Sequence, residues 1–336
     1  MEQTMRAVGF SNYGGPEVLE MLRLPRPAVA ADGVLVRVVA AGVNPADWRI
    51  RNGQFKRFLR VKLPLVLGSD LAGVVEQVGP AVTRFRPGDA VYAMLPVDVC
   101  GAYAEFAAVP ERHLAHIPAG LSFSEAAATP LAGLTALQAL RDKVRLWPNA
   151  QVLINGAVGG VGSFAVQLAA AGGVWVTGVC SGRNAALARS LGATEVIDYT
   201  QVDVTAGAPR FDVVFDTVDA LPFRRWRRVL KPGGTLIAVN PMAGLLAPGW
   251  LAPLYGGRRV KSVFVQASGP DLGQLGGLIA AGRVRPLVER SYPLEQAAEA
   301  QRYSATYRVR GKLVLVVDPQ LAGQTADALA GELVGG

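Results

Sequence analysis

The feature that most constrains the fold is a glycine-rich segment between an apolar strand pattern at 151–154 and an apolar helix pattern at 161–170. The segment reads Asn155-Gly156-Ala157-Val158-Gly159-Gly160-Val161-Gly162. Gly159 lets the backbone approach a pyrophosphate, and Gly162 lets the helix pack closely on the strand. The free N–H groups at the helix start then face the phosphates. The segment therefore predicts a dinucleotide site with contacts at Ala157, Gly159, Gly160 and Val161.

One position departs from the usual pattern for such a site. In G-x-G-x-x-G the first glycine corresponds to Ala157, so the initial tight turn has to tolerate a methyl group. A glycine-rich turn that binds no ligand remains the other interpretation of this segment.

Strand and helix patterns alternate through the middle of the chain. Strands are predicted at 174–179, 195–197, 211–215 and 235–239, and helices at 184–191 and 223–230. This alternation predicts a doubly wound parallel sheet with helices on both faces. The earlier residues form short β-branched runs separated by glycine and proline, which predicts an irregular, mostly β domain. We expect an α/β protein with domains at 1–125 and 126–265, and a return to the first domain at 266–336, which includes a C-terminal tail.

Composition excludes several classes of protein. The 336 residues are 51% hydrophobic and 18% charged, so the chain can bury substantial cores and is not disordered. No apolar run reaches the roughly 18–20 residues of a membrane span, and the first residues lack a secretory pattern. Two cysteines cannot build a disulfide framework, which favours a cytoplasmic protein.

The net charge of +8 has its densest source in the run Arg224-Arg225-Trp226-Arg227-Arg228. Phe223, Trp226 and Leu230 recur at helical spacing, which places the arginines on a solvated helix face. We therefore expect no nucleic acid and no membrane as partners. The excess positive charge instead favours attraction of an anionic cofactor.

The end of the second strand of the parallel sheet indicates which cofactor is used. Proteins that bind NAD normally place an acid there, about 20 residues beyond the loop, for the ribose 2′-hydroxyl. The sequence at this point is Cys180-Ser181-Gly182-Arg183-Asn184, without an acid. Ser181 can donate a hydrogen bond, and Arg183 offers a planar cation suited to a 2′-phosphate. We predict NADPH rather than NADH; a solvated arginine at a helix start is the alternative for Arg183.

These motifs resemble the medium-chain dehydrogenase/reductase superfamily and, within it, the zinc-independent quinone oxidoreductase (zeta-crystallin-like) branch. The resemblance runs from Tyr13-Gly14-Gly15-Pro16-Glu17-Val18-Leu19 to Arg310-Gly311-Lys312-Leu313-Val314-Leu315, with further matches at 41–48, 67–75, 86–92 and 126–137. It implies a Rossmann domain that binds NADPH and a GroES-like catalytic domain. It also implies a homodimer formed through the strand predicted at 259–265.

Zinc-binding relatives carry Cys and His-Glu where this chain has Asn44 and Ser69-Asp70. An amide and a hydroxyl are poor substitutes for the thiolate and imidazole that zinc prefers. The four-cysteine lobe of those relatives is also missing, because residues 92–100 alone separate the Gly-Asp-x-Val motif from Gly101-Ala102-Tyr103. We predict that the chain binds no metal.

Without a Lewis acid, the acceptor has to take up a hydride readily, as quinones and enones do. Asn44 can donate a hydrogen bond to the carbonyl or to the nicotinamide ribose, or can serve as a turn residue before Pro45. Asp47 can orient Asn44, relay a proton or cap a helix. Trp48 stands where relatives often have tyrosine and forms either an apolar wall or part of the core. The proton comes from Tyr103 or from solvent.

The resemblance also implies cofactor contacts elsewhere in the chain. It places Thr129 near the nicotinamide, Tyr199 near the adenine ribose, Phe264-Val265 near the carboxamide and Lys312 near the phosphates. A solvated lysine at a strand end is the alternative for Lys312. Two further functions remain open: a double-bond reductase of enoyl thioesters and a non-catalytic NADPH-binding protein.

Overall fold

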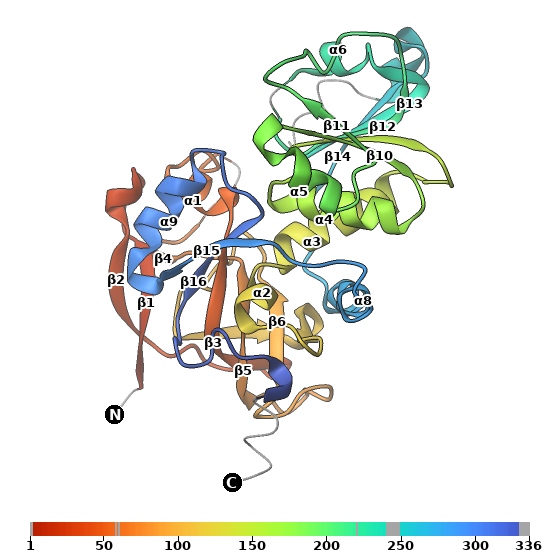
Figure 1. Ribbon diagram of the computed structural model, residues 1–336. Coiled ribbons are helices and arrows are strands. Elements are labelled where there is room, and N and C mark those ends of the chain that lie inside the picture. The colour runs from red at the N-terminus through yellow and green to blue at the C-terminus, as the bar shows by residue number, and fades with distance from the viewer. Residues whose placement is uncertain (1–2, 58, 60, 220, 240–248, 329–336) are drawn as a thin grey trace. The chain divides into compact units, whose positions relative to one another are not determined.

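The computed structural model describes residues 3–57, 59, 61–219, 221–239 and 249–328 (Figure 1). The chain divides into two compact units. The first comprises residues 1–134, 266–282 and 286–336, and the second comprises residues 135–265 and 283–285. Part of the predicted C-terminal tail, residues 329–336, lies outside the described residues.

The first unit is built mainly from antiparallel strands. A three-stranded sheet has the order β2-β1-β4, and a seven-stranded sheet has the order β15-β16-β3-β5-β6-β8, with β7 also paired to β3. The strands are β1 (Thr4–Phe10), β2 (Glu20–Pro25), β3 (Gly33–Val43), β4 (Leu65–Val66), β5 (Asp70–Val78), β6 (Ala90–Met94), β7 (Phe106–Pro110), β8 (Leu114–His116), β15 (Val288–Pro293) and β16 (Lys312–Val316). Only β15 and β16 pair in parallel among these described strands. This unit confirms the mostly β domain that the sequence predicts for the first part of the chain.

Short helices complete the first unit. They are η1 (Pro16–Val18), α1 (Pro45–Arg51), η2 (Glu111–His113), α2 (Phe123–Ala127), α8 (Gly269–Ala280), η6 (Leu294–Gln296) and α9 (Ala297–Ser304). The helix α3 (Pro130–Gln138) begins in the first unit and ends in the second, which starts at Thr135. Apolar side chains of the strands, among them Phe10, Val36 and Leu71, form a core that is closed to solvent.

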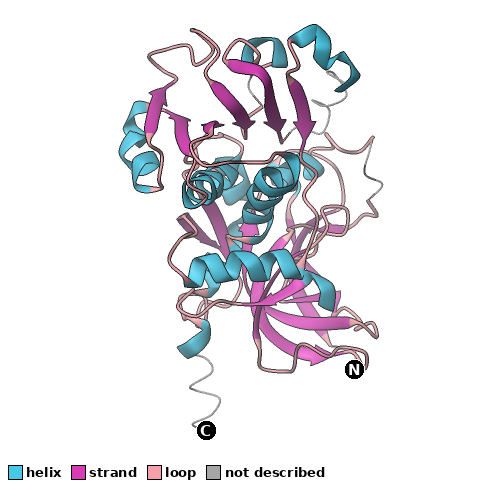
Figure 2. Cartoon of the chain, turned by 90° about the vertical axis from the view of Figure 1, so that its right-hand side faces the viewer, coloured by secondary structure: helices cyan, strands magenta, loops and turns pink. Residues whose placement is uncertain are grey.

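The second unit is a parallel sheet of six strands in the order β11-β10-β9-β12-β13-β14. The strands are β9 (Gln151–Asn155), β10 (Trp175–Cys180), β11 (Glu195–Asp198), β12 (Phe211–Asp216), β13 (Leu230–Ala238) and β14 (Arg259–Ser262), seen side by side in Figure 2. The helices are η3 (Ala139–Lys143), α4 (Gly160–Ala171), η4 (Gly182–Asn184), α5 (Ala185–Ser190), α6 (Phe223–Trp226) and η5 (Gly249–Tyr255). Counted from β9, this is the 3-2-1-4-5-6 order of the Rossmann fold, with a switch point between β9 and β12.

The first boundary between the two units lies later in the chain than the predicted boundary between residues 125 and 126. Residues 123–138 form two helices, α2 and α3, and Ser122 caps the first by accepting a hydrogen bond from the N–H of Glu125 at 3.2 Å. Because α2 packs on β3 and β5, it belongs to the first unit, and the second unit starts at Thr135 rather than at residue 126. The first unit resumes at Gln266, and Arg283–Arg285 group with the second unit.

The arginine-rich helix is shorter than its sequence pattern suggests. The helix α6 ends at Trp226, and the chain joins the sheet at Leu230, which pairs with Phe211. Trp226 is completely buried, whereas Arg224, Arg227 and Arg228 are exposed, as expected for an apolar side facing the core. None of the described helices is both long and apolar enough to cross a membrane.

Candidate active site

The glycine-rich segment forms the turn between β9 and α4. Gly156 has a φ of +80°, a left-handed conformation that glycine adopts without strain. A Cβ on Gly162 would collide with the carbonyl oxygen of Gly156. Glycine at this position therefore allows the helix to begin directly against the turn, as the sequence pattern requires.

The methyl group of Ala157 is accommodated by the neighbouring strand. Ala157 is fully buried, and the N–H groups of Gly156 and Ala157 donate to the carbonyl of Val179 at 3.1 and 3.0 Å. A Cβ on Gly178 of β10 would lie only 3.0 Å from the Cβ of Ala157. The tight turn expected at Ala157 therefore falls on Gly156, and Gly178 leaves the space that the methyl group needs.

The start of α4 fits the pyrophosphate of a dinucleotide. The first N–H groups of a helix have no intrahelical acceptor, and the helix dipole makes this end positive. In α4 this first turn includes Gly160 and Val161, the N-cap Gly159 has no side chain, and no acid occurs in the turn. Backbone donors without a competing carboxylate are suited to binding phosphate.

The residues expected at the ribose lie at and beyond the carboxyl ends of β10 and β11. Ser181 is half-buried, and its Oγ accepts a hydrogen bond from the side-chain amide of Asn184 at 3.2 Å. Arg183 is exposed, and no described carboxylate forms an ion pair with it. The side chain of Tyr199 is 60% exposed. These positions leave Arg183 and Tyr199 accessible to a ligand.

A carboxylate that the sequence analysis does not include lies at the same edge. Asp198 ends β11 in register with Cys180 and accepts from the N–H and hydroxyl of Thr200 at 2.9 and 2.7 Å. These bonds, with one from the N–H of Gly182, hold the pKa of Asp198 below its usual value. The sequence prediction concerns the end of β10, whereas Asp198 ends the neighbouring strand β11. The two strand ends lie together because parallel strands finish at the same edge of a sheet.

A second group missed by sequence reasoning joins the carboxyl ends of β9 and β12. The carboxylate of Asp216 accepts from the side-chain amide of Asn155 at 2.8 Å and from the indole N–H of Trp226 at 3.0 Å. It also accepts from the N–H groups of Val218 and Asp219 at 3.1 Å. Asp216 therefore fixes the backbone at the switch point of the sheet, where Rossmann proteins bind their ligands.

The other cofactor candidates are distributed over both units. Phe264 and Val265 follow β14, and Phe264 is 59% exposed whereas Val265 is half-buried. Thr129 is fully buried in the first unit, and its hydroxyl donates to the carbonyl of Glu125 at 2.8 Å. The nicotinamide contacts that the resemblance implies for these three residues remain predictions.

In the first unit, strand register brings together residues that are far apart in the sequence. In the antiparallel pairs of β3, Gly42 lies opposite Asp70 of β5, and Val43 lies opposite Leu313 of β16. Asn44, which follows β3, is therefore next to the first residues of both neighbouring strands. Those first residues are Asp70 and Lys312.

A buried ammonium group lies between Asn44 and Asp70. The Nζ of Lys312 donates to the side-chain oxygen of Asn44, to the carbonyl of Val43 at 3.1 Å and to Asp70 at 3.2 Å. The amide of Asn44 donates to the same Asp70 carboxylate at 2.9 Å, and the N–H of Leu131 donates to its other oxygen at 2.8 Å. Lys312 is only 4% exposed and Asp70 is fully buried. The solvated lysine considered for Lys312 is therefore wrong, and the phosphate contact implied for it remains a prediction.

A second buried pair adjoins this cluster. Tyr103 donates its hydroxyl to Asp47 at 2.8 Å, and the same carboxylate oxygen accepts from the backbone N–H of Asn44 at 2.7 Å. Burial raises the pKa of Asp47 to about 7, although both hydrogen bonds oppose the shift. Burial, and then the carboxylate of Asp47, raise the pKa of Tyr103 well above its usual value. Asp47 thus both orients Asn44 and caps α1, two of the roles that the sequence left open.

Trp48 lies against the C-terminal part of the first unit. It is 6% exposed, and its ring meets that of Tyr307 edge-on with centroids 5.7 Å apart. The guanidinium of Arg49 lies 5.3 Å from the indole centroid. Its burial and these contacts match the core role, one of the two interpretations of Trp48.

The high pKa of Asp47 predicts a pH-dependent cost to folding. Between about pH 4 and pH 7 the folded chain holds a proton on Asp47 that the unfolded chain releases, so this group disfavours folding increasingly as the pH rises. Asp47→Asn mimics the protonated form and retains an acceptor for Asn44 and Tyr103. We expect the stability of Asp47→Asn relative to wild type to increase over this range, measured by urea unfolding midpoints. If the unfolding midpoints of the two proteins changed in parallel with pH, the pKa of Asp47 would not be raised.

The residues at the zinc-ligand positions do not fit a zinc ion. Asn44 and Asp70 lie together, but they are an amide and a carboxylate already bonded to the ammonium of Lys312. Zinc requires thiolate, imidazole or carboxylate donors and would have to displace this cation. Among the described residues, no group of three or more His, Cys, Asp or Glu side chains is placed to hold a metal.

Sequence and structure comparisons agree on the family. Residues 30–119 match the family described as alcohol dehydrogenase GroES-like domain, and residues 191–315 match the one described as zinc-binding dehydrogenase. A chloroplastic quinone oxidoreductase from Triphysaria versicolor is 33% identical over 93% of this chain and 98% of its own length. The chloroplastic NADPH-dependent alkenal/one oxidoreductase of Arabidopsis thaliana is 35% identical over 94% of this chain and 80% of its own length.

A solved structure gives the same result. The quinone oxidoreductase of Escherichia coli, complexed with NADPH, superimposes with a TM-score of 0.82 at 28% identity, over 93% of this chain and all of that chain. The fold and the relatives together define a medium-chain dehydrogenase/reductase. This chain belongs to that superfamily and, within it, to the quinone oxidoreductase branch, which makes it a quinone oxidoreductase-like NAD(P)H reductase.

Proposed function

We propose that this chain transfers a hydride from NADPH to a quinone or another conjugated carbonyl without a metal ion. The observation that carries the proposal is the buried cluster of Asn44, Asp70 and Lys312, where zinc-dependent relatives place their ligands. A site with this donor set has no Lewis acid to polarise a simple carbonyl. The acceptor therefore has to delocalise the incoming charge itself, as quinones and enones do.

The names of two relatives support this class of acceptor. One is called a quinone oxidoreductase and the other an alkenal/one oxidoreductase, and both are similar to this chain over more than 90% of its length. Quinones and enones share a carbonyl conjugated to a carbon–carbon double bond. We propose this shared group, rather than one named compound, as the substrate class.

For the cofactor, we propose that the first turn of α4 binds the pyrophosphate through the N–H groups of Gly160 and Val161. Ser181 and Arg183 bind the 2′-phosphate, because a guanidinium without a carboxylate partner matches a phosphate dianion. The adenine ribose lies against Tyr199, which is accessible. NADPH supplies the hydride, and the protein supplies orientation, which can lower a barrier by roughly 7–11 kcal/mol in favourable cases.

On the substrate side, we assign to Asn44 a hydrogen bond to the substrate oxygen or to the nicotinamide ribose. Its amide group has two N–H donors, and Asp70 uses one of them, so one is left for the substrate oxygen or the nicotinamide ribose. Asp47 and Tyr103 position this residue through its backbone N–H. The hydroxyl of Tyr103 already donates to Asp47, which favours solvent over Tyr103 as the proton source.

The first test is NADPH oxidation with benzoquinone, phenanthrenequinone and a simple enone, followed by the cofactor's near-ultraviolet absorbance. We expect turnover that resists a metal chelator and prefers NADPH to NADH. Asn44→Ala should lower kcat by about 10²–10³-fold, the usual cost of removing one donor to a developing oxyanion. Tyr103→Phe should have a smaller effect, because solvent remains available.

Two outcomes would contradict the proposal. Turnover that is lost with the chelator and restored by zinc would show that the reaction depends on a metal. Tight NADPH binding without oxidation by any acceptor would instead favour an enoyl-thioester reductase or a non-catalytic binding protein, and a thioester panel would separate these two.

A further inference from the structure

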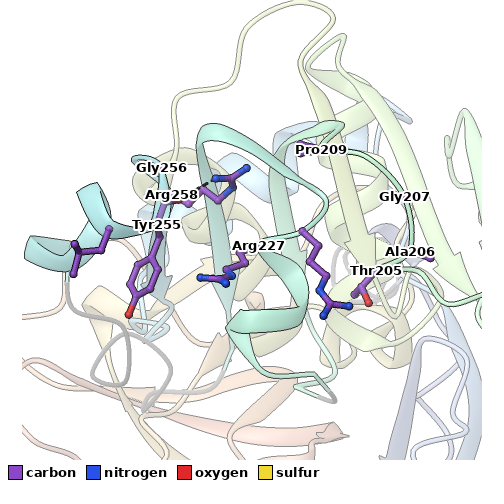
Figure 3. Close-up of a pocket in the computed structure, with 10 residues that line it drawn as sticks. Thr205, Ala206, Gly207, Pro209, Arg227, Tyr255, Gly256 and Arg258 are labelled. Atoms are coloured by element: carbon purple, nitrogen blue, oxygen red, sulfur yellow. Dashed lines mark hydrogen bonds between the residues drawn. The ribbon is translucent and has the colours of Figure 1, made fainter.

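A recess of about 660 Å³ lies on the second unit, away from the glycine-rich turn (Figure 3). Its walls come from segments 205–209, 227–228 and 254–258, which precede β12, β13 and β14 respectively. Because these strands are parallel, the recess lies at their amino ends. The turn at Gly156 and the carboxylate of Asp216 lie at the opposite, carboxyl edge of the sheet. The recess is therefore separate from the proposed cofactor site.

Three arginines give the recess its charge. Arg227, Arg228 and Arg258 all line it, and no described carboxylate forms an ion pair with any of them. The neighbouring cations differ in this respect, since Arg225 pairs with Asp203 at 2.6 Å and Lys231 pairs with Asp212 at 2.9 Å. The three lining guanidinium groups are thus a local excess of positive charge within a chain of net charge +8.

Two of these guanidinium groups are held in place without losing their charge. Arg258 donates from Nε to the carbonyl of Leu230 at 2.8 Å and from Nη1 to that of Tyr255 at 3.0 Å. The guanidinium of Arg227 lies 5.9 Å from the ring centroid of Tyr255, which is itself fixed edge-on against Phe223. Figure 3 shows Arg227 between Tyr255 on one side and Thr205, Ala206 and Gly207 on the other. Carbonyl and aromatic partners orient a cation but do not neutralise it.

We propose that this recess binds a small molecule that carries a diphosphate group. Guanidinium forks match phosphate oxygens in pairs, and three of them balance the roughly three negative charges of a diphosphate near neutral pH. The volume falls within the range of about 300–1,000 Å³ that is usual for small-molecule sites. The arginine run that the sequence places on a solvated helix face therefore contributes two residues to a binding site.

The test is calorimetric titration of the full chain at near-physiological salt and saturating NADPH, which under the proposed function occupies the turn before α4. The probes are inorganic pyrophosphate, ADP and citrate. The variant R227Q/R228Q removes two lining charges, and the control R145Q/R224Q removes two exposed charges outside the recess. We expect pyrophosphate or ADP to bind wild type and the control equally, and R227Q/R228Q at least tenfold more weakly.

The relative strength of the probes identifies the ligand more closely. Tighter binding of ADP than of pyrophosphate points to an organic diphosphate, and the reverse order points to the inorganic ion. The proposal is overturned if wild type shows no saturable binding, if both double variants weaken equally, or if citrate binds as tightly as the diphosphates. Because the readout is binding rather than turnover, failure of the proposed reductase activity leaves this test intact.

Discussion

Lys312→Met is expected to lower the free energy of unfolding by about 3–5 kcal/mol, the usual cost of removing one partner of a buried ion pair. The substitution leaves Asp70 fully buried without its cation and leaves the side-chain oxygen of Asn44 without a donor. A methionine fills a similar volume, so the loss reflects charge rather than a cavity. Urea unfolding followed by circular dichroism measures it.

Two variants separate this effect from general perturbation. Lys312→Met combined with Asp70→Asn removes both charges, and we expect it to recover a large part of the lost stability. Arg37→Met breaks the partly exposed pair with Asp318 in the same unit and should cost no more than about 1 kcal/mol. If Lys312→Met is as mild as Arg37→Met, the buried ammonium is not compensating Asp70.

The pH dependence gives an independent check on the same variant. Burial raises the pKa of Asp70, whereas the ammonium of Lys312 and the hydrogen bond from Asn44 oppose the shift. Without Lys312 the carboxyl group should take up a proton more readily. The destabilisation by Lys312→Met should therefore shrink as the pH falls, because protonated Asp70 no longer carries a buried charge.

The sequence predicts the architecture of the second unit well because its signals are local. A buried strand, a glycine-rich turn and an apolar helix lie within 151–171, and their spacing alone indicates a Rossmann turn. The sequence near Ala157 does not show where its methyl group finds space. It depends on Gly178, which lies on the next strand and leaves room for the methyl group only after the sheet has formed.

The substrate-side cluster of the first unit could be predicted from the sequence only in part. Asn44, Asp47 and Tyr103 are identified from sequence through family resemblance, and the structure brings all three together. The partner of Lys312 could not be identified in this way, because Asp70 lies 242 residues earlier and only the pairing of β16, β3 and β5 joins them. The sequence also gives no sign that burial raises the pKa of Asp47, because burial is a property of the folded unit.

Arg183→Ala should convert a preference for NADPH into near equality of the two cofactors. Charge-assisted hydrogen bonds contribute about 1.5–3 kcal/mol, so the KM for NADPH should rise roughly 10- to 150-fold. The KM for NADH should stay within a factor of about two, because NADH lacks the 2′-phosphate that Arg183 is proposed to bind. Initial rates with a single quinone and both cofactors measure this change. The NADH series is an internal control for folding.

A substitution at Asp198 gives a second test of the same cofactor preference. Its ionised carboxylate lies one strand away from Ser181, so a 2′-phosphate at this edge meets a nearby negative charge that Arg183 has to offset. Asp198→Asn should therefore lower the KM for NADPH, in the opposite direction to Arg183→Ala. The control Arg189→Ala removes an exposed cation from α5 and should change neither constant appreciably. Equal increases in both KM values for Arg183→Ala, or an equal effect of Arg189→Ala, would show that Arg183 acts through general charge and does not select the cofactor.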